Sequence, residues 1–203
     1  MLITAIEPRR KSLSALFLDG ELAGNIDTET LLKFGCKPGM QLDDGQLHEL
    51  ILASESRRAG EKALYLLEHR SHSQKELADK ISRVTSREAA EAAAKHMVEI
   101  GLVNDEEYAR SLAAELLGRK GFSASRVRQE LLQKGIEREL AERIIEENAA
   151  DPVEKILELI RRKYIRTLDD EKGRRRSIAA LQRLGYRWDD IRTALNQLIN
   201  EDE

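Results

Sequence analysis

The chain has 203 residues, with 34 Lys and Arg against 37 Asp and Glu, and its formal net charge is −3. Charged residues form 35% of it and aromatic residues 4%, a composition typical of helices with large solvated faces. Its apolar runs are far shorter than the roughly 20 residues of a membrane span, and no signal-peptide pattern is visible. These features exclude a membrane protein and favour a cytoplasmic chain of one or two mainly helical domains.

The first 45 residues have the pattern of a small β-rich module. Three apolar segments predict strands, at 2–6, 14–18 and 21–26. Asp19-Gly20 separates the last two, and these residue types favour a two-residue hairpin turn with positive φ. Residues 27–34 are expected to form a short helix or turn that ends at Gly35. Because so small a sheet is marginal alone, we expect it to pack on the helices that follow.

From residue 46 onward, apolar residues recur at the three- and four-residue spacings of amphipathic helices. The predicted helices span about 46–69, 74–82, 86–100, 105–118, 123–133, 137–149, 152–165, 170–183 and 188–201. The first of these has an alternative, a break near Ala59-Gly60. Helix starts are indicated by an oxygen-bearing cap three residues before Glu, at Ser73, Thr85, Asn104 and Asp151. Helix ends are indicated by Gly101, Gly121, Gly135, Gly173 and Gly185.

The helical part repeats one layout at a spacing of about 50 residues. The residues in register are Ile81, Leu131 and Leu181; Leu77, Val127 and Ser177; and Thr85, Gly135 and Gly185. Such self-similarity is typical of tandem arrays, in which each unit buries its apolar face against its neighbours. We therefore predict a β-rich module at 1–45, followed by three-helix repeats at 46–104, 105–150 and 151–203. Thr85 and Ser177 depart from the pattern, which indicates divergent repeats.

An ordered set of residues resembles a known family. Its members are Glu76-Leu77, residues 101–105, residues 108–110, Arg119, Gly121, Arg126, Glu130-Leu131 and residues 134–136. Together they resemble the RecX family, regulators of the bacterial recombinase RecA, most clearly over residues 60–150. The resemblance implies an elongated, curved array of three-helix repeats that binds RecA nucleoprotein filaments and inhibits recombination. Residues 1–45 lie outside it, so it implies no role for them.

The sequence has no pattern of catalytic or metal-binding residues. Neither of the Gly-rich phosphate-binding motifs is present, which argues against an NTPase. His69 and His72 lie three residues apart with no Cys or carboxylate at ligand spacing, and we expect both to be exposed. The single cysteine, Cys36, excludes an internal disulfide and has no evident base beside it. We therefore predict a protein that is not an enzyme and holds neither metal nor cofactor.

Basic residues gather in two parts of the chain. Residues 119–138 hold six bases against two acids, and residues 158–192 hold eleven against six. Isolated bases such as Lys62 and Lys155 fit a solvated helix face. The clustered bases suit DNA phosphates or an acidic protein groove, because they recur in the second helix of two repeats. The candidate contacts are Arg119, Lys120, Arg126, Arg128, Lys134, Arg161, Arg162, Lys163, Arg174, Arg175 and Arg176.

The leading hypothesis is a monomeric inhibitor that lies along the RecA–single-stranded-DNA filament and opposes ATP turnover and strand exchange. Modest contacts from three repeats would add through effective concentration. Two alternatives remain, a direct DNA-binding protein with helix-turn-helix-like units and a helical adaptor for another protein. Stacking on bases is weakly supported because aromatic residues are few, and we expect Trp188, like Leu102, to lie in the core.

Overall fold

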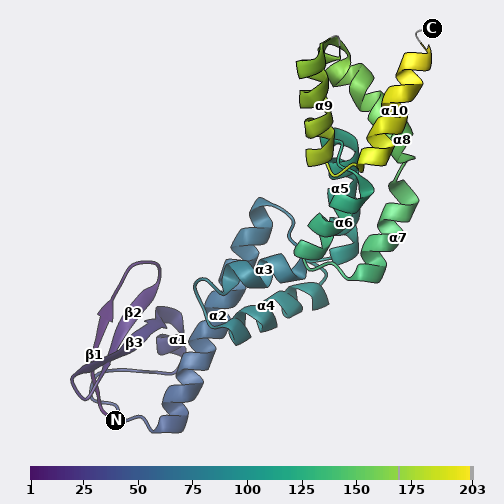
Figure 1. Cartoon of the computed structure of the whole chain (residues 1–203). Helices are drawn as coiled ribbons and strands as arrows, with labels where there is room; N and C mark the ends of the chain where they lie inside the picture. Colours follow the sequence, from purple (N-terminus) through teal and green to yellow (C-terminus); the bar gives the residue numbers. More distant parts are fainter. Residues whose placement is uncertain (169, 202–203) are drawn as a thin grey trace. The chain divides into compact units, whose positions relative to one another are not determined.

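The computed structural model describes residues 1–168 and 170–201, which form a mainly helical protein with a small antiparallel sheet at its N-terminus (Figure 1). The chain divides into two compact units, Met1–Asn104 and Asp105–Glu203. Within the described residues, no helix has both the length and the apolar character needed to cross a membrane. The predicted fold class, mainly α with an N-terminal β-rich module, is confirmed.

The sheet consists of β1 (Ile3–Pro8), β2 (Leu13–Leu18) and β3 (Glu21–Asp27), paired antiparallel in that order. Asp19 and Gly20 form the turn between β2 and β3 with φ values of 51° and 89°. These positive angles explain the residue types there, since Asp and Gly tolerate the left-handed region. The helix α1 (Thr28–Lys33) follows directly, with the Asp27 carboxylate accepting a hydrogen bond from the Thr30 amide.

The helix α2 (Asp44–His69) packs against the sheet near its start and against later helices near its end. Leu50 is buried in one apolar cluster with Ile3 and Leu16, so the sheet packs on a helix as expected. Further along α2, Ala59 and Ala63 belong to a second cluster. The helix passes Gly60 without a break, so the alternative of two helices is wrong.

The second cluster is completed by α3 (Gln74–Ile81) and α4 (Arg87–Glu99). Ser73 caps α3 by accepting a hydrogen bond from the Glu76 amide at 3.2 Å. At α4 the cap is Ser86, whose Oγ accepts from the Ala89 amide, rather than Thr85. The predicted position of this cap was wrong by one residue. Both Thr85 and Ser86 carry a hydroxyl that can cap a helix.

The second unit begins with α5 (Asp105–Ala114), the π-helical segment η1 (Glu115–Lys120), α6 (Ala124–Gln133) and α7 (Arg138–Asn148). It continues with α8 (Pro152–Leu159), the π-helical η2 (Ile160–Tyr164), the short 3-10 helix η3 (Ile165–Thr167), α9 (Glu171–Arg183) and α10 (Trp188–Glu201). Two apolar clusters form here, one around Leu131 and Ile144 and one around Leu181 and Ile191. Each set of three helices thus surrounds a cluster of its own. The bounds of the three repeats stay a prediction.

Two of the three sets of residues placed in register by the 50-residue spacing are buried, and the set of Thr85, Gly135 and Gly185 is partly exposed. Ile81 and Leu131 are fully buried, and Leu181 is 1% exposed. Ser177 is also buried, and its hydroxyl lies 2.7 Å from that of Thr167, which satisfies the polar group in an apolar setting. The divergent Ser177 is therefore accommodated by a residue of its own repeat.

Gly173 has a different role from the one predicted. It lies inside α9 and is buried, whereas we expected it to end a helix. A Cβ at this position would lie 2.0 Å from the Thr167 carbonyl oxygen, so only glycine lets α9 approach the preceding segment. The expectation that Leu102 and Trp188 lie in the core is also wrong, since they are 53% and 49% exposed.

Candidate partner-binding surface

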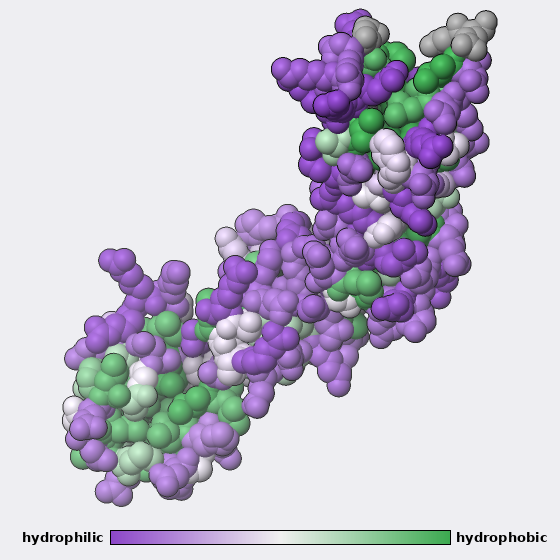
Figure 2. All heavy atoms as spheres, in the orientation of Figure 1, coloured by the Kyte–Doolittle hydropathy of each residue, from purple (hydrophilic) through white to green (hydrophobic). Residues whose placement is uncertain are grey.

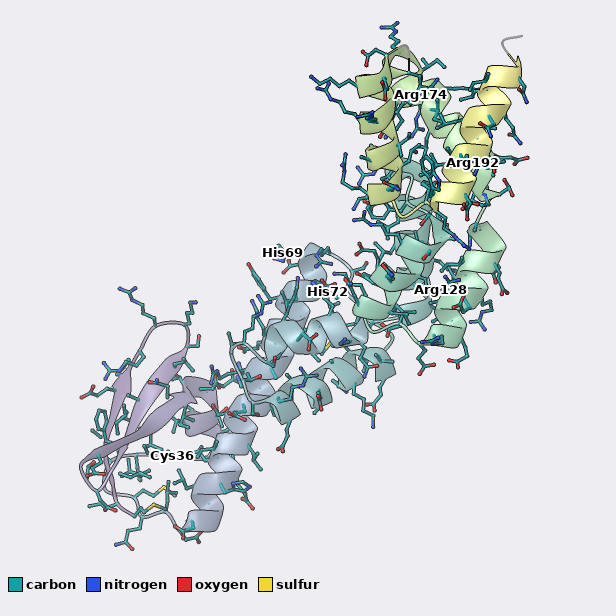
Figure 3. All side chains as sticks on the ribbon, viewed as in Figure 1. Cys36, His69, His72, Arg128, Arg174 and Arg192 are labelled. Atoms are coloured by element: carbon teal, nitrogen blue, oxygen red, sulfur yellow. The ribbon has the colours of Figure 1, made fainter. Side chains whose placement is uncertain are left out.

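The helix α9 presents a dense group of exposed cations. Gly173, Ser177 and Leu181 form its buried side, and the arginines at 174–176 are all exposed. Lys172, Arg175 and Arg176 border a shallow hollow of about 500 Å³. The surface over α9 is strongly hydrophilic in Figure 2, and Figure 3 labels Arg174 on this helix. We call the residues Lys172, Arg174, Arg175 and Arg176 the α9 cation patch.

The cations of this patch form few ion pairs with the rest of the chain. Arg174 and Arg176 form no ion pair with any part of the chain that the structure describes. Arg175 pairs with Glu171 at 2.5 Å, but both side chains are 78% exposed. Such exposed pairs contribute about 0–1 kcal/mol, so little is lost when a partner displaces them. The patch therefore offers positive charge that an anionic partner can use.

The cations of α6 are used inside the molecule instead. Arg128 donates two hydrogen bonds of 2.7 Å to the Glu142 carboxylate and so ties α6 to α7 (Figure 3). These bonds lower the pKa of Glu142 below its usual range. Arg126 lies over the Phe122 ring, 4.0 Å from its centroid, and donates to the Arg183 carbonyl oxygen of the next repeat. Both side chains thus have structural partners, and a contact from either to another molecule stays a prediction.

The other predicted contact residues differ in whether they interact with residues of the same chain. Arg119 and Lys120 lie 2.5 and 3.6 Å from the Glu115 carboxylate, and Arg162 lies 3.5 Å from Glu158. Lys134 and Arg161 also interact within the chain. Lys163 is exposed and forms no ion pair among the described residues. The structure therefore brings together one compact group of cations, on α9, and most of the remaining candidates, though not Lys163, interact with other residues of the chain.

A cavity of about 480 Å³ lies beside the contact between α6 and the α9–α10 turn. Its lining includes Leu117, Phe122, Arg128, Lys155, Tyr186 and Arg187. These residues come from separate parts of the sequence, and no local pattern marks them as one site. The sequence indicates a solvated helix face for Lys155 and a candidate contact for Arg128, without relating the two. We call this feature the inter-repeat cavity.

Three residues were considered for chemistry, and of these His69 is exposed as expected. His72 is 3% exposed, so the expectation of an exposed side chain is wrong. Its Nδ1 lies 2.8 Å from the Arg70 carbonyl oxygen and its Nε2 lies 3.0 Å from Lys80 Nζ. Burial lowers the pKa of His72 and raises that of the half-buried Cys36 thiol. No group of three or more potential metal ligands occurs among the described residues.

The chain is similar to a group of named bacterial proteins. It is 33% identical to the regulatory protein RecX of Caldanaerobacter subterraneus subsp. tengcongensis, over 97% of this chain and 99% of that protein. It is 25% identical to RecX of Bacillus subtilis, over 99% of this chain and 78% of that one. The family description "RecX, second three-helix domain" matches residues 104–144, which contain α5 to α7 apart from the last turn of α7.

Solved structures agree in fold. A crystal structure of a regulatory protein RecX superimposes with a TM-score of 0.60 at 20% identity, covering 96% of this chain and 98% of that one. RecX from Lactobacillus salivarius gives a TM-score of 0.57 at 22% identity, covering 72% and 97%. The structural likeness establishes the fold, and the sequence identity over nearly the whole chain establishes the relationship. The chain belongs to the RecX family of regulatory proteins.

Proposed function

We propose that this chain is a monomeric inhibitor that binds along RecA–single-stranded-DNA filaments and suppresses RecA ATPase and strand exchange. The observation that carries the proposal is 33% identity to a regulatory protein RecX over 97% of the chain. The relatives are named as regulatory proteins, and the residues of the ordered set resemble a family that regulates RecA. The chain would act by occupying the filament and not by catalysis.

The α9 cation patch supports binding to an anionic partner. Its arginines are exposed, and two of them form no ion pair with the described residues, so binding requires little rearrangement of the fold. DNA phosphates and acidic protein grooves both attract such a patch. Further modest contacts from the other repeats would add through effective concentration. A filament, which repeats along its axis, suits a chain that is itself built from repeats.

The proposal is tested by adding the purified chain to RecA, ATP and single-stranded DNA and by measuring ATP hydrolysis and strand exchange. We expect both to fall as the chain approaches the RecA concentration. A variant with Arg174, Arg175 and Arg176 all changed to Gln should need about a tenfold higher concentration for half-inhibition. That change equals about 1.4 kcal/mol, or roughly 0.5 kcal/mol for each exposed cation.

The matched control removes the same charge from another exposed basic run. Arg9, Arg10 and Lys11 lie in the loop between β1 and β2, and all three are exposed. Changing them to Gln should leave inhibition unchanged, which separates a local contact from an effect of net charge. Unchanged ATPase and strand exchange at several-fold excess of the wild-type chain over RecA would contradict the proposal.

Direct binding to bare DNA is the second candidate, and the α9 cation patch is the observation that favours it. Binding through phosphates would weaken steeply with salt, by a slope of about 0.7 per contacted phosphate on single strands. Fluorescence anisotropy with a labelled oligonucleotide at several salt concentrations measures this slope. Binding to bare DNA that is as tight as binding to the filament would favour this candidate over the first.

A further inference from the structure

The helices that line the inter-repeat cavity are joined by a hydrogen bond and by close packing. The amide of Ser123, the residue that caps α6, donates a 2.9 Å hydrogen bond to the Leu184 carbonyl oxygen. A Cβ on Gly185 would lie 2.5 Å from Ser123 Oγ, and one on Gly121 would lie 2.8 Å from a methyl carbon of Leu159. Two glycines therefore permit close packing of these helices. The cavity lies within one compact unit and is preformed, as most small binding sites are.

The lining of the cavity combines apolar surface with positive charge. Leu117, Phe122 and several alanines provide the apolar part. The charged lining consists of three cations and one carboxylate, namely Arg128, Lys155, Arg187 and Asp190. Two of the cations also pair with carboxylates outside the lining, Arg128 with Glu142 and Lys155 with Glu158. The start of α6 also borders the cavity, and the positive end of its dipole favours an anion.

Tyr186 adds, beside the cavity, a buried polar group without a partner among the described residues. Its side chain lines the cavity and is 6% exposed, and its buried hydroxyl has no hydrogen-bond partner in the described part of the chain. Buried polar groups are rarely left without a partner. Burial, together with the charge of Glu158, raises the pKa of Tyr186 to about 12, so the hydroxyl keeps its proton at neutral pH. It is therefore a donor that lacks an acceptor.

We propose that the inter-repeat cavity is a docking pocket for an acidic peptide segment of a protein partner. An apolar side chain of the segment occupies the space beside Leu117 and Phe122, and its carboxylates lie near the cations of the lining. A volume of about 480 Å³ falls in the range of small binding pockets. A nucleic acid strand fits less well, because the apolar lining calls for an aliphatic or aromatic side chain. The pocket is separate from the α9 cation patch, so each can fail without the other.

The test uses the full chain and a short fluorescein-labelled peptide in which a Phe-Leu pair is flanked by Asp and Glu. Gly118 lines the cavity, and a Cβ built on it meets nothing within 4 Å, so Gly118→Leu fills the pocket without a backbone clash. Fluorescence anisotropy should show about tenfold weaker binding to this variant. Gly60→Leu is the matched control, because Gly60 is also a helical glycine with open space around its Cβ, and it should bind like wild type.

Tyr186→Phe gives a second variant that preserves the ring. Loss of one donor should weaken peptide binding about fivefold, whereas the melting temperature should hold or rise, since the hydroxyl has no partner to lose among the residues that the structure describes. Peptides with Lys in place of the acidic residues, or with Ser in place of Phe-Leu, should not bind.

Any of the following results would overturn the proposal. The first is absence of binding at about millimolar peptide, or equal binding by wild type and Gly118→Leu. The second is an oligonucleotide that binds in a manner abolished by Gly118→Leu, which would assign the pocket to nucleic acid. The third is self-association of the wild-type chain in sedimentation experiments that Gly118→Leu removes, which would assign it to a second copy.

Discussion

A single buried histidine links the stability of this protein to pH. His72 is held between the Arg70 carbonyl oxygen and the Lys80 ammonium group, an arrangement that suits the neutral ring. Its pKa in the folded chain lies below the ordinary value of 6.5, mainly because the ring is buried and further because of the charge on Arg70. Below about pH 6.5 the unfolded chain therefore binds more protons than the folded one.

We expect His72 to lower the free energy of unfolding as the pH falls below about 6.5. Above that value, His72 should not make the free energy of unfolding depend on pH. Chemical denaturation at a series of pH values measures the effect. His72→Gln should flatten the profile between pH 5 and 7. An unchanged profile in His72→Gln would show that other groups produce the pH dependence.

Residue-level expectations succeeded where the local sequence decides the outcome. Asp19-Gly20 adopts the positive φ values that its residue types favour. His72 could not be placed from the sequence, because a polar residue next to a helix start gives no sign that later segments will cover it. Trp188 shows the reverse case, since a large aromatic side chain at the start of a helix remains half-exposed.

At the scale of elements, Gly185 determines how closely α6 can approach the turn between α9 and α10. Its φ is +95°, and a Cβ there would lie 2.5 Å from Ser123 Oγ and 2.7 Å from Arg126 Cβ. Gly101 has a similar φ of +77°, but its Cβ position is open. The two glycines therefore separate the effect of backbone conformation from that of steric contact.

We expect Gly101→Ala to lower the free energy of unfolding by about 1–2 kcal/mol, the usual cost of a left-handed non-glycine residue. Gly185→Ala should add about 1–3 kcal/mol for the crowded contact with α6. Thermal and urea denaturation of the two variants gives the difference. Equal losses would mean that the structure tolerates a methyl group at this junction.

Helix starts could be predicted from capping residues, but the role of a residue inside a helix could not. Ser73 and Asp151 cap the helices whose starts they predicted. Gly173 was taken for a helix end because glycine favours such positions, yet it serves the close approach of α9 to Thr167. The two roles require the same residue type, and only tertiary packing distinguishes them.

At the scale of the whole molecule, the basic clusters that the sequence suggested as contacts differ from the cations that the structure leaves available, in a way that the sequence could not reveal. Arg128 contacts Glu142, which is 14 residues away, and Arg126 contacts the Arg183 carbonyl 57 residues away. A linear charge pattern does not show which cations have such partners. The inter-repeat cavity was likewise absent from the predictions, because its lining joins segments near residues 118, 150 and 186.

The four apolar clusters predict how the chain unfolds. Among the described residues, each cluster draws its members from one compact unit, two from 1–104 and two from 105–203. Within the second unit, the packing of Leu159 against Gly121 and the hydrogen bond from Ser123 to Leu184 connect repeats two and three. These repeats should therefore unfold together, and the first unit should unfold in a transition of its own.

The single tryptophan, Trp188, lies in the second unit and reports on it alone, whereas far-UV circular dichroism reports on both units. Ile81 and Leu131 are fully buried, one in each unit, so either change to Ala should cost about 2–5 kcal/mol. Leu131→Ala should shift the tryptophan transition although it lies in a different repeat, because the two repeats are joined by direct contacts. Ile81→Ala should shift only a part of the circular dichroism signal. If Ile81→Ala moved the tryptophan transition by the same amount, the chain would unfold as one cooperative unit and the assignment of separate transitions would be wrong.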